Sequence, residues 1–173
     1  MDRRLKWAIL VTALLLVVSY GTVQSLYKKN YDAYIDNYVK ESAESGTLKL
    51  KVKIESKQTA YHNLGTDITK DHTLNGVPVK NGDIVAAADV LRFTTTITED
   101  DGTDDKGTGS AAIYLPSLIN SSLLESDTIS ITVRERGGRK YPNAYATWDV
   151  TYTVTPYIDK DSISYWDVVF FNP

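Results

Sequence analysis

The first 25 residues constrain this chain most, because they join a basic start to an apolar run. Arg3, Arg4 and Lys6 come first, and an apolar stretch over residues 8–18 follows, interrupted only by Thr12. Cations ahead of a short, mostly aliphatic stretch form the n-region and h-region of an export signal. The sequence therefore predicts that the rest of the chain lies outside the cytoplasm.

Residues 1–25 are either a cleaved signal peptide or a single-pass membrane anchor. The strict apolar run has the length of a signal h-region and is short for a spanning helix. Residues 7–23 reach the lower limit for spanning the membrane and would place Trp7 and Tyr20 as interfacial aromatics. A cleavage site after Ser25 has suitable spacing but lacks the A-x-A pattern. We expect an anchor in the cell membrane with an extracellular C-terminal domain, and secretion after signal cleavage is the alternative.

Residues 26–45 predict an amphipathic stalk helix that continues from the membrane and ends near Gly46. Four tyrosines recur at spacings of four, three and four, which puts them on one stripe: Tyr27, Tyr31, Tyr34 and Tyr38. We expect this stripe to pack on the domain that follows. Weak self-association through the Tyr27–Tyr38 helix is the alternative, although fewer than two heptads is little to hold a dimer.

Residues 46–173 predict a mainly β domain, because the period of the apolar positions changes to two. Leu48, Leu50, Val52 and Ile54 alternate with charged residues, and a second strand is expected near Gln58–Leu64. Eight or nine short strands separated by turn signals favour an antiparallel immunoglobulin-like β-sandwich.

Several local signals refine this prediction. Asn75-Gly76 is the strongest hairpin signal, and Pro78 keeps the following arm at a sheet edge. Alternate residues over 144–154 share one inward face. We expect a final strand over Ile163–Phe171, with Trp148 and Trp166 as core anchors.

Composition excludes several classes of function. The chain contains no cysteine, which excludes a disulfide framework, a thiol nucleophile and thiolate metal sites. Without residues 1–25, which hold three cations and one acid, 16 basic and 21 acidic residues remain. A mildly acidic domain of this kind is not expected to bind nucleic acid.

An acidic segment is the candidate metal site. Five carboxylates fall within residues 99–105: Glu99, Asp100, Asp101, Asp104 and Asp105. Oxygen ligands at this density suit calcium, although the spacing is not that of an EF-hand. A solvated hairpin tip without a bound ion is the simpler interpretation, so we expect no cofactor apart from this calcium alternative.

A basic turn is the candidate contact surface. Arg134, Arg136, Arg139 and Lys140 surround Gly137-Gly138, with only Glu135 opposing them. Such a patch suits an envelope protein or an anionic cell-wall polymer, and a charged turn for solubility is the simpler alternative.

No enzyme motif is found in the sequence. Gly107-Thr108-Gly109-Ser110 lacks the order of a nucleophile elbow, and there is no phosphate loop or HExxH motif. We therefore expect a binding or interaction module at the cell envelope. A cell-wall or glycan-active enzyme is a less favoured alternative.

Five segments stand out together: residues 61–65, 74–76, 80–83 and 132–139, and the apolar segment over 163–171. They resemble segments of uncharacterised exported or membrane-anchored β-sandwich proteins of Gram-positive bacteria such as clostridia. The resemblance covers roughly residues 47–171. It implies an extracytoplasmic location and a sandwich fold, and it implies no catalytic residue. We also expect residues 62–65 to form a turn in which Gly65 supplies an unusual backbone angle.

Overall fold

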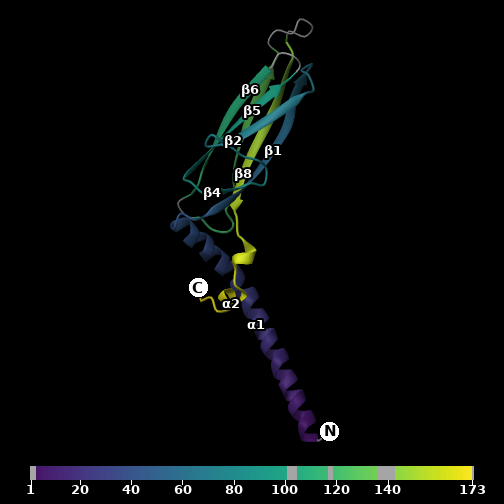
Figure 1. Cartoon of the computed structure of the whole chain (residues 1–173), viewed down its shortest axis with the longest axis vertical. Coiled ribbons are helices and arrows are strands. Elements are labelled where there is room, and N and C mark those ends of the chain that lie inside the picture. The colour runs from purple at the N-terminus through teal and green to yellow at the C-terminus, as the bar shows by residue number, and fades with distance from the viewer. Residues whose placement is uncertain (1–2, 101–104, 117–118, 136–142, 173) are drawn as a thin grey trace. The chain divides into compact units, whose positions relative to one another are not determined.

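The computed structural model of the protein describes residues 3–100, 105–116, 119–135 and 143–172, with side chains from Leu10 onward (Figure 1). The chain divides into two compact units, and each is described by itself. One unit combines Met1–Tyr38 with Ile158–Pro173, and the other is Val39–Tyr157. The C-terminal residues therefore belong to the same unit as the N-terminal helix.

Helix α1 (Arg3–Glu44) runs without a break for 42 residues. It ends where Gly46 adopts a φ of 68° and its amide donates to the carbonyl of Ala43 at 3.1 Å. The amide of Thr47 donates to the carbonyl of Ser42 at 2.9 Å. A left-handed glycine after the last turn satisfies carbonyls that the helix itself leaves without partners. The predicted helix that ends near Gly46 is confirmed.

The C-terminal segment forms a 3-10 helix, η1 (Lys160–Ser162), and a short α-helix, α2 (Tyr165–Val169). The predicted strand over 163–171 is wrong. Tyr165, Val168 and Val169 recur at i, i+3 and i+4, a spacing that suits a helix, and both valines are buried. Trp166 is 56% exposed, so the prediction that it anchors the core is wrong as well.

In the second unit, the described residues form two four-stranded sheets. The strands are β1 (Lys49–His62), β2 (Ile68–Leu74), β3 (Val77–Pro78), β4 (Ile84–Ala86), β5 (Val90–Glu99), β6 (Asp105–Tyr114), β7 (Glu125–Arg134) and β8 (Tyr145–Pro156). One sheet has the order β4-β1-β8-β7 and the other β3-β2-β5-β6 (Figure 1). All pairings between these strands are antiparallel. The predicted mainly β, antiparallel fold is confirmed, and its immunoglobulin-like character stays a prediction.

Strand β8 supplies the centre of the core. Its inward residues are buried as predicted: Ala144 just before the strand, then Ala146, Trp148, Val150, Tyr152 and Val154. The ring of Tyr152 stacks on Phe93 of β5, with centroids 4.4 Å apart, and this contact joins the two sheets. The prediction for Trp148, which is 5% exposed, is confirmed.

Strand β1 is longer than the sequence pattern indicated. The separate strand expected near Gln58–Leu64 is wrong, because these residues up to His62 continue β1 along β8. The pairing shifts register between Gln58 and Ala60. Such a bulge breaks the alternation that marks a strand, which explains why one long strand looked like two.

The hairpin between β2 and β3 follows the predicted turn. Asn75 and Gly76 have φ values of 50° and 83°, and Leu74 pairs with Val77 across them. Two successive residues with positive φ are typical of a type I′ turn, which Asn-Gly favours. Pro78 lies on β3 at the edge of its sheet, as predicted.

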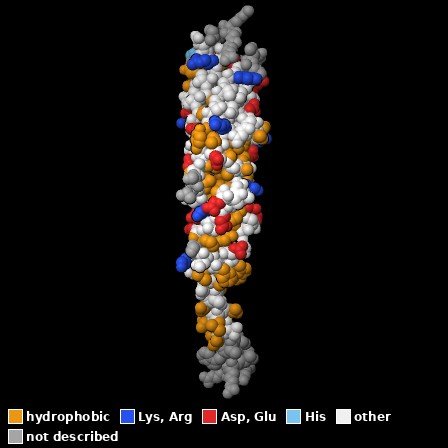
Figure 2. Space-filling model, turned by 90° about the vertical axis from the view of Figure 1, so that its left-hand side faces the viewer, with side chains coloured by type: hydrophobic (Ala, Val, Ile, Leu, Met, Phe, Trp, Pro, Cys, Tyr) orange, Lys and Arg blue, Asp and Glu red, His pale blue; other side chains and the backbone are white. Residues whose placement is uncertain are grey.

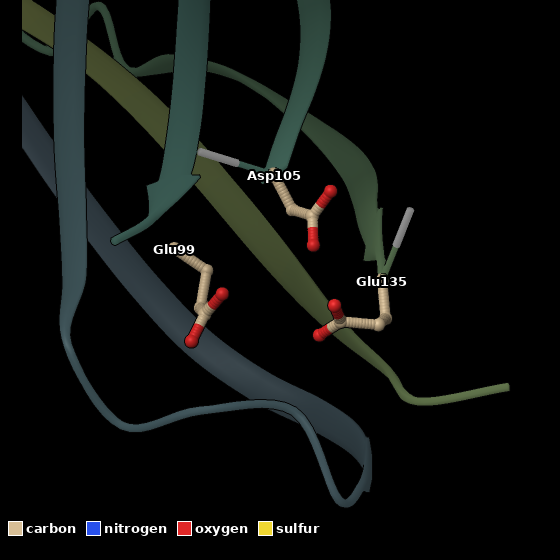
Figure 3. A group of neighbouring side chains, drawn as sticks. All are labelled: Glu99, Asp105 and Glu135. Carbon is tan, nitrogen blue, oxygen red and sulfur yellow. The ribbon is translucent and has the colours of Figure 1, made fainter. Parts of the chain in front are cut away.

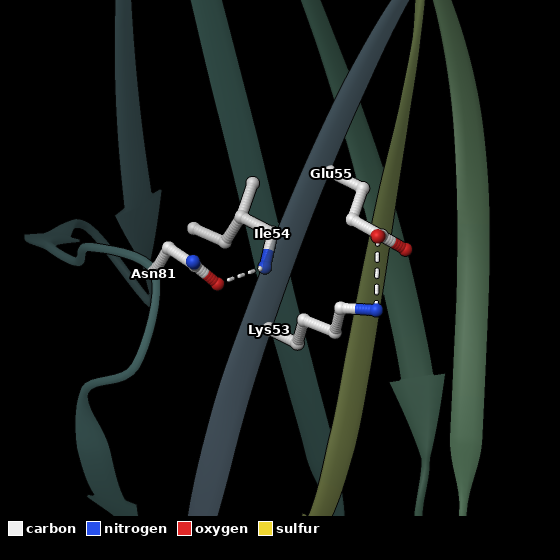
Figure 4. A network of polar contacts seen from close by, with 4 residues as sticks. All are labelled: Lys53, Ile54, Glu55 and Asn81. Atoms are coloured by element: carbon white, nitrogen blue, oxygen red, sulfur yellow. Dashed lines mark hydrogen bonds and ion pairs between the residues drawn. The ribbon is translucent and has the colours of Figure 1, made fainter.

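The turn between β3 and β4 is attached to β1 (Figure 4). Asn81 Oδ1 accepts from the amide of Ile54 at 2.9 Å, and the amide of Gly82 donates to the carbonyl of Val52 at 2.8 Å. These bonds pair backbone groups of β1 that the short strand β4 does not reach. Unpaired backbone groups at the edge of a sheet can pair with a strand of another chain. The neighbouring ion pair, Lys53 to Glu55 at 2.9 Å, is exposed and contributes little.

Candidate functional site

The apolar part of α1 is exposed on all sides. Every residue from Leu10 to Tyr20 is exposed, with Leu14 at 60% and Leu16 at 66%. The most apolar window of this helix has a mean hydropathy of 1.6, and none of it is buried. Figure 2 shows the hydrophobic side chains in orange next to the grey N-terminal end. A helix of this length and composition can cross a membrane, and a signal sequence meets the same description.

The C-terminal segment is attached to α1 by polar and aromatic contacts within the first unit. Asn30 Nδ2 donates to the carbonyl of Val169 at 3.2 Å and to that of Phe171 at 3.0 Å. The Tyr27 ring stacks on Tyr165 at 4.7 Å, and Tyr34 meets Phe171 edge to face at 5.5 Å. Two of the four tyrosines of the stripe therefore contact the protein's own C-terminal segment.

Helix α2 leaves two large aromatic side chains exposed. Trp166 and Phe170 are 56% and 76% exposed, and their rings stack with centroids 5.8 Å apart. An apolar groove lies between this helix and α1, lined by Leu16, Ser19, Tyr20, Val23, Gln24, Tyr165 and Trp166. A second groove, one to two turns further along α1, is lined by Tyr27, Lys28, Tyr31, Asp32 and Lys160.

Three carboxylates converge in the second unit, at the β5–β6 hairpin (Figure 3). Glu99 ends β5 and pairs with Asp105, the first residue of β6, and Glu135 follows the end of β7. One carboxylate oxygen of each lies within 4.8 Å of the others. Glu99 and Asp105 are 0% and 1% exposed. Carboxylate oxygens gathered at this distance are ligands that a cation such as calcium can bind.

The five predicted metal ligands are only partly brought together. Glu99 and Asp105 are in the cluster, whereas Asp100 is exposed and its amide donates to the carbonyl of Asp67 at 3.0 Å. Asp101 and Asp104 lie outside the described residues. Sequence reasoning missed Glu135, because only the packing of β7 beside β6 brings it near Glu99.

Gly65 packs directly against the cluster. A Cβ at this position would lie 1.7 Å from Glu99 Oε1. The left-handed backbone of this turn belongs to Asn63, with a φ of 54°, and not to Gly65 as predicted. A side chain at position 65 would therefore require either the Glu99 carboxylate or the turn to move.

Of the predicted basic contact surface, the structure describes only Arg134. Arg134 is exposed at the end of β7, and its guanidinium lies 5.5 Å from the centre of the Tyr145 ring. A cation over an aromatic face is attractive and fixes the direction of the side chain. Arg136, Arg139 and Lys140 lie outside the described residues.

Three hydrogen-bonded polar side chains, His72, Thr95 and Tyr152, lie between the two sheets. His72 Nδ1 is 2.7 Å from Thr95 Oγ1, and the Thr95 hydroxyl also bonds the hydroxyl of Tyr152. Burial lowers the pKa of His72, the Lys70 charge lowers it further, and Asp71 opposes them. Burial raises the pKa of Tyr152. With Thr95 fully buried, this group satisfies polar atoms inside the core.

No protein-family model matches the chain, and no curated protein matches it. The geometry of α1, its C-terminal partner segment and the acidic cluster is therefore the basis for a functional proposal.

Proposed function

We propose that this protein is an exported, single-pass membrane protein whose β-sandwich acts as a binding module at the cell envelope. Residues 7–23 of α1 would cross the membrane with the N-terminus inside. The three cations Arg3, Arg4 and Lys6 precede the apolar stretch, and cations flanking a span favour the cytoplasmic side. The extracellular location agrees with what the sequence resemblance implies.

The observation that carries this proposal is the continuity of α1 from its exposed apolar stretch to Glu44. Cleavage after Ser25 would cut the helix two residues before Tyr27, whose ring stacks on Tyr165. It would also remove Tyr20 and Val23 from the groove that they share with Trp166. The groove that Tyr20 and Val23 share with Trp166 supports a retained anchor, because cleavage would remove these two residues, whereas Tyr27 stays in the chain in either case.

Fractionation of the native protein tests the anchor. We expect the full-length chain in the membrane pellet, resistant to alkaline carbonate, with its β-sandwich open to protease added outside intact cells. A chain found in the culture medium and beginning after residue 25 would show instead that residues 1–25 are a cleaved signal.

The basic turn after β7 is the proposed contact surface for an anionic cell-wall polymer or an envelope protein. The exposed Arg134 and the three further cations at 136, 139 and 140 support this assignment. Replacing Arg134, Arg136 and Arg139 with Ser should weaken binding to cell-wall fractions, and added salt should weaken wild-type binding. A matched control replaces Lys49, Lys51 and Lys53 of β1 with Ser, which removes the same charge elsewhere. Equal retention of all three proteins would contradict the assignment.

Calcium binding is the second candidate function, and the convergence of Glu99, Asp105 and Glu135 favours it. Calcium takes carboxylate oxygens in flexible geometries. Calorimetric titration of the full chain should show heat of binding and a raised melting temperature, both lost in the variant E99Q/D105N. The exposed Asp89 supplies the control D89N. A flat trace with an unchanged melting temperature would remove this candidate.

A further inference from the structure

We propose that Trp166 and Phe170 insert into the outer headgroup region of the bilayer and complete the membrane anchor from the C-terminal side. This inference rests on the proposed function, because it needs α1 to cross the membrane. It makes the end of the chain a second lipid-contacting element. The lipid-bilayer interface is the single occupant that we assign to these two exposed rings.

The apolar stretch of α1 is short for a bilayer. Residues 7–23 extend about 25 Å at about 1.5 Å per residue, against a hydrocarbon core of about 30 Å. A span shorter than the hydrocarbon core leaves its polar flanking residues within the hydrocarbon, unless the bilayer thins or neighbouring groups compensate. Additional apolar and aromatic surface at one end of the stretch would supply that compensation.

Trp166 supplies aromatic surface near the C-terminal end of the proposed span. It shares a groove with Leu16, Tyr20 and Val23 of α1, which lie in the C-terminal half of the proposed span. Trp and Tyr concentrate where the hydrocarbon core meets the headgroups, because their rings are apolar and carry one polar group. Tyr20 is 68% exposed and lines the same groove, so two exposed aromatic residues from distant parts of the sequence lie at one level of the helix.

The polarity of the first unit changes along α1 in the order that a bilayer interface requires. The side chains from Leu10 to Val18 are exposed, and all except Thr12 are apolar. Tyr20 and Trp166 follow, and the next groove along the helix contains Lys28, Asp32 and Lys160. Hydrocarbon, interface and aqueous headgroup layers would meet these three zones in turn. A protein partner would instead favour a one-sided apolar stripe on α1.

Helix α2 holds the two rings in a defined position. Val168 and Val169 are buried, whereas Trp166 and Phe170 lie four residues apart on the other side of the helix. Asn30 donates to two carbonyls at the end of this segment, and Tyr27 stacks on Tyr165. Because these contacts order the segment before it meets lipid, insertion costs little further conformational entropy.

Quenching by brominated lipids tests this inference on the full-length chain. The variant W7F keeps Trp148, which is buried in the sandwich and serves as an internal reference, and Trp166. The matched control W7F/W166F keeps Trp148 alone. Both are reconstituted into phosphatidylcholine vesicles whose acyl chains carry bromine near the headgroups. We expect blue-shifted emission and a loss of intensity in W7F that W7F/W166F does not show.

Two readouts separate this inference from the proposed function. Flotation with the vesicles and resistance to carbonate report the anchor, whereas quenching reports Trp166. If both variants float and their quenching is equal, Trp166 lies outside the bilayer and the inference is overturned while the anchor stands. If neither the wild-type chain nor W7F floats with the vesicles, the proposed anchor is overturned, and the inference that rests on it is overturned with it.

Discussion

The ring of Tyr27 in α1 stacks on the ring of Tyr165 in α2, with centroids 4.7 Å apart and planes 12° apart. Aromatic pairs of this kind contribute about 0.5–1.5 kcal/mol beyond the area that they bury. The contact joins segments from opposite ends of the chain within one compact unit. It is placed directly after the apolar stretch of α1, so any membrane that this helix enters lies close to α2.

Replacing Asn30 with Ala should loosen α2. The Asn30 amide donates to the carbonyl of Val169, the last residue of α2, and to that of Phe171, which follows the helix. The last carbonyls of a helix have no partner within it. Loss of two such bonds should lower the free energy of local opening by about 1–3 kcal/mol. Hydrogen exchange of the Phe170 and Phe171 amides, which donate within this segment, measures the change.

The neighbouring variant K29A serves as the control for N30A. Lys29 is exposed on the same turn of α1, so its removal should leave exchange in the C-terminal segment unchanged. The amides of the sandwich should exchange at the wild-type rate in both variants. Equal exchange of Phe170 in N30A and K29A would mean that the Asn30 bonds do not hold the segment.

Replacing Leu15 with Arg should release the chain from the membrane. Leu15 is 64% exposed near the middle of the apolar stretch, and a charge at the centre of a span costs about 2.5–3.5 kcal/mol on insertion scales. The measurement is the fraction of full-length chain that resists carbonate extraction. In the control L26R the same substitution falls beyond residue 23, where an arginine side chain can extend into the headgroups. Equal extraction of the two variants would contradict an anchor at residues 7–23.

The fold was predictable where local chemistry and tertiary packing agree. Over β8, alternation of inward residues from Ala146 to Val154 marks a strand buried on one face, and the structure buries all of them. At Asn75-Gly76 the residues themselves favour positive φ, so the turn needs no tertiary contact to be predicted. The part of helix α1 after Thr22 was predictable for the same reason, because no Pro or Gly interrupts the chain between Thr22 and Ser45.

The C-terminal segment shows why the rest was not predictable. Residues 163–171 are apolar with two competing periods, and such a short run fits a strand or a helix equally well. Contacts with α1 stabilise the helix: Asn30 bonds the carbonyl of Val169, and Tyr27 stacks on Tyr165. Both partners come from the other end of the chain, so local sequence does not reveal them. The acidic cluster is a similar case. Glu99 and Asp105 lie six residues apart in sequence, but Glu135 comes near them only because β7 packs beside β6.

Replacing Gly65 with Ala should destabilise the sandwich next to the acidic cluster. The added methyl group would lie 1.7 Å from Glu99 Oε1, so the turn or the carboxylate must move. Overpacking of this kind costs about 1–3 kcal/mol. Urea denaturation of the full-length chain in the W7F/W166F background, in detergent micelles and followed by the emission of Trp148, measures the loss. An unchanged midpoint would show that Glu99 moves away at no cost.

A double-mutant cycle with E99A identifies the cause of that loss. Shortening Glu99 removes the atoms that the new methyl group would meet, so G65A should cost much less in the E99A background than in the wild type. If G65A costs the same in both backgrounds, its effect arises from the backbone of the turn and not from the Glu99 carboxylate.

Acidification should weaken the sandwich through His72. Its pKa lies below the ordinary value near 6.5, because burial and Lys70 disfavour the protonated ring. The unfolded chain therefore binds more protons than the folded chain once the pH falls below about 6.5, and stability decreases from there down through the folded pKa. The contribution is fully present above about pH 6.5. Melting temperatures between about pH 7.5 and about pH 5.5 measure it, above the range where most carboxylates titrate.

Two histidine variants assign this pH dependence. H72N keeps an atom that can bond the Thr95 hydroxyl but cannot titrate, so its melting temperature should be lower at every pH and nearly flat between about pH 7.5 and about pH 5.5. H62N removes the other histidine, which is exposed at the end of β1, and should keep the wild-type slope. The ring of Tyr152 stacks on Phe93 and also faces His72, so the histidine lies beside the contact that joins the two sheets. A wild-type slope in H72N would place the titrating group elsewhere in the chain.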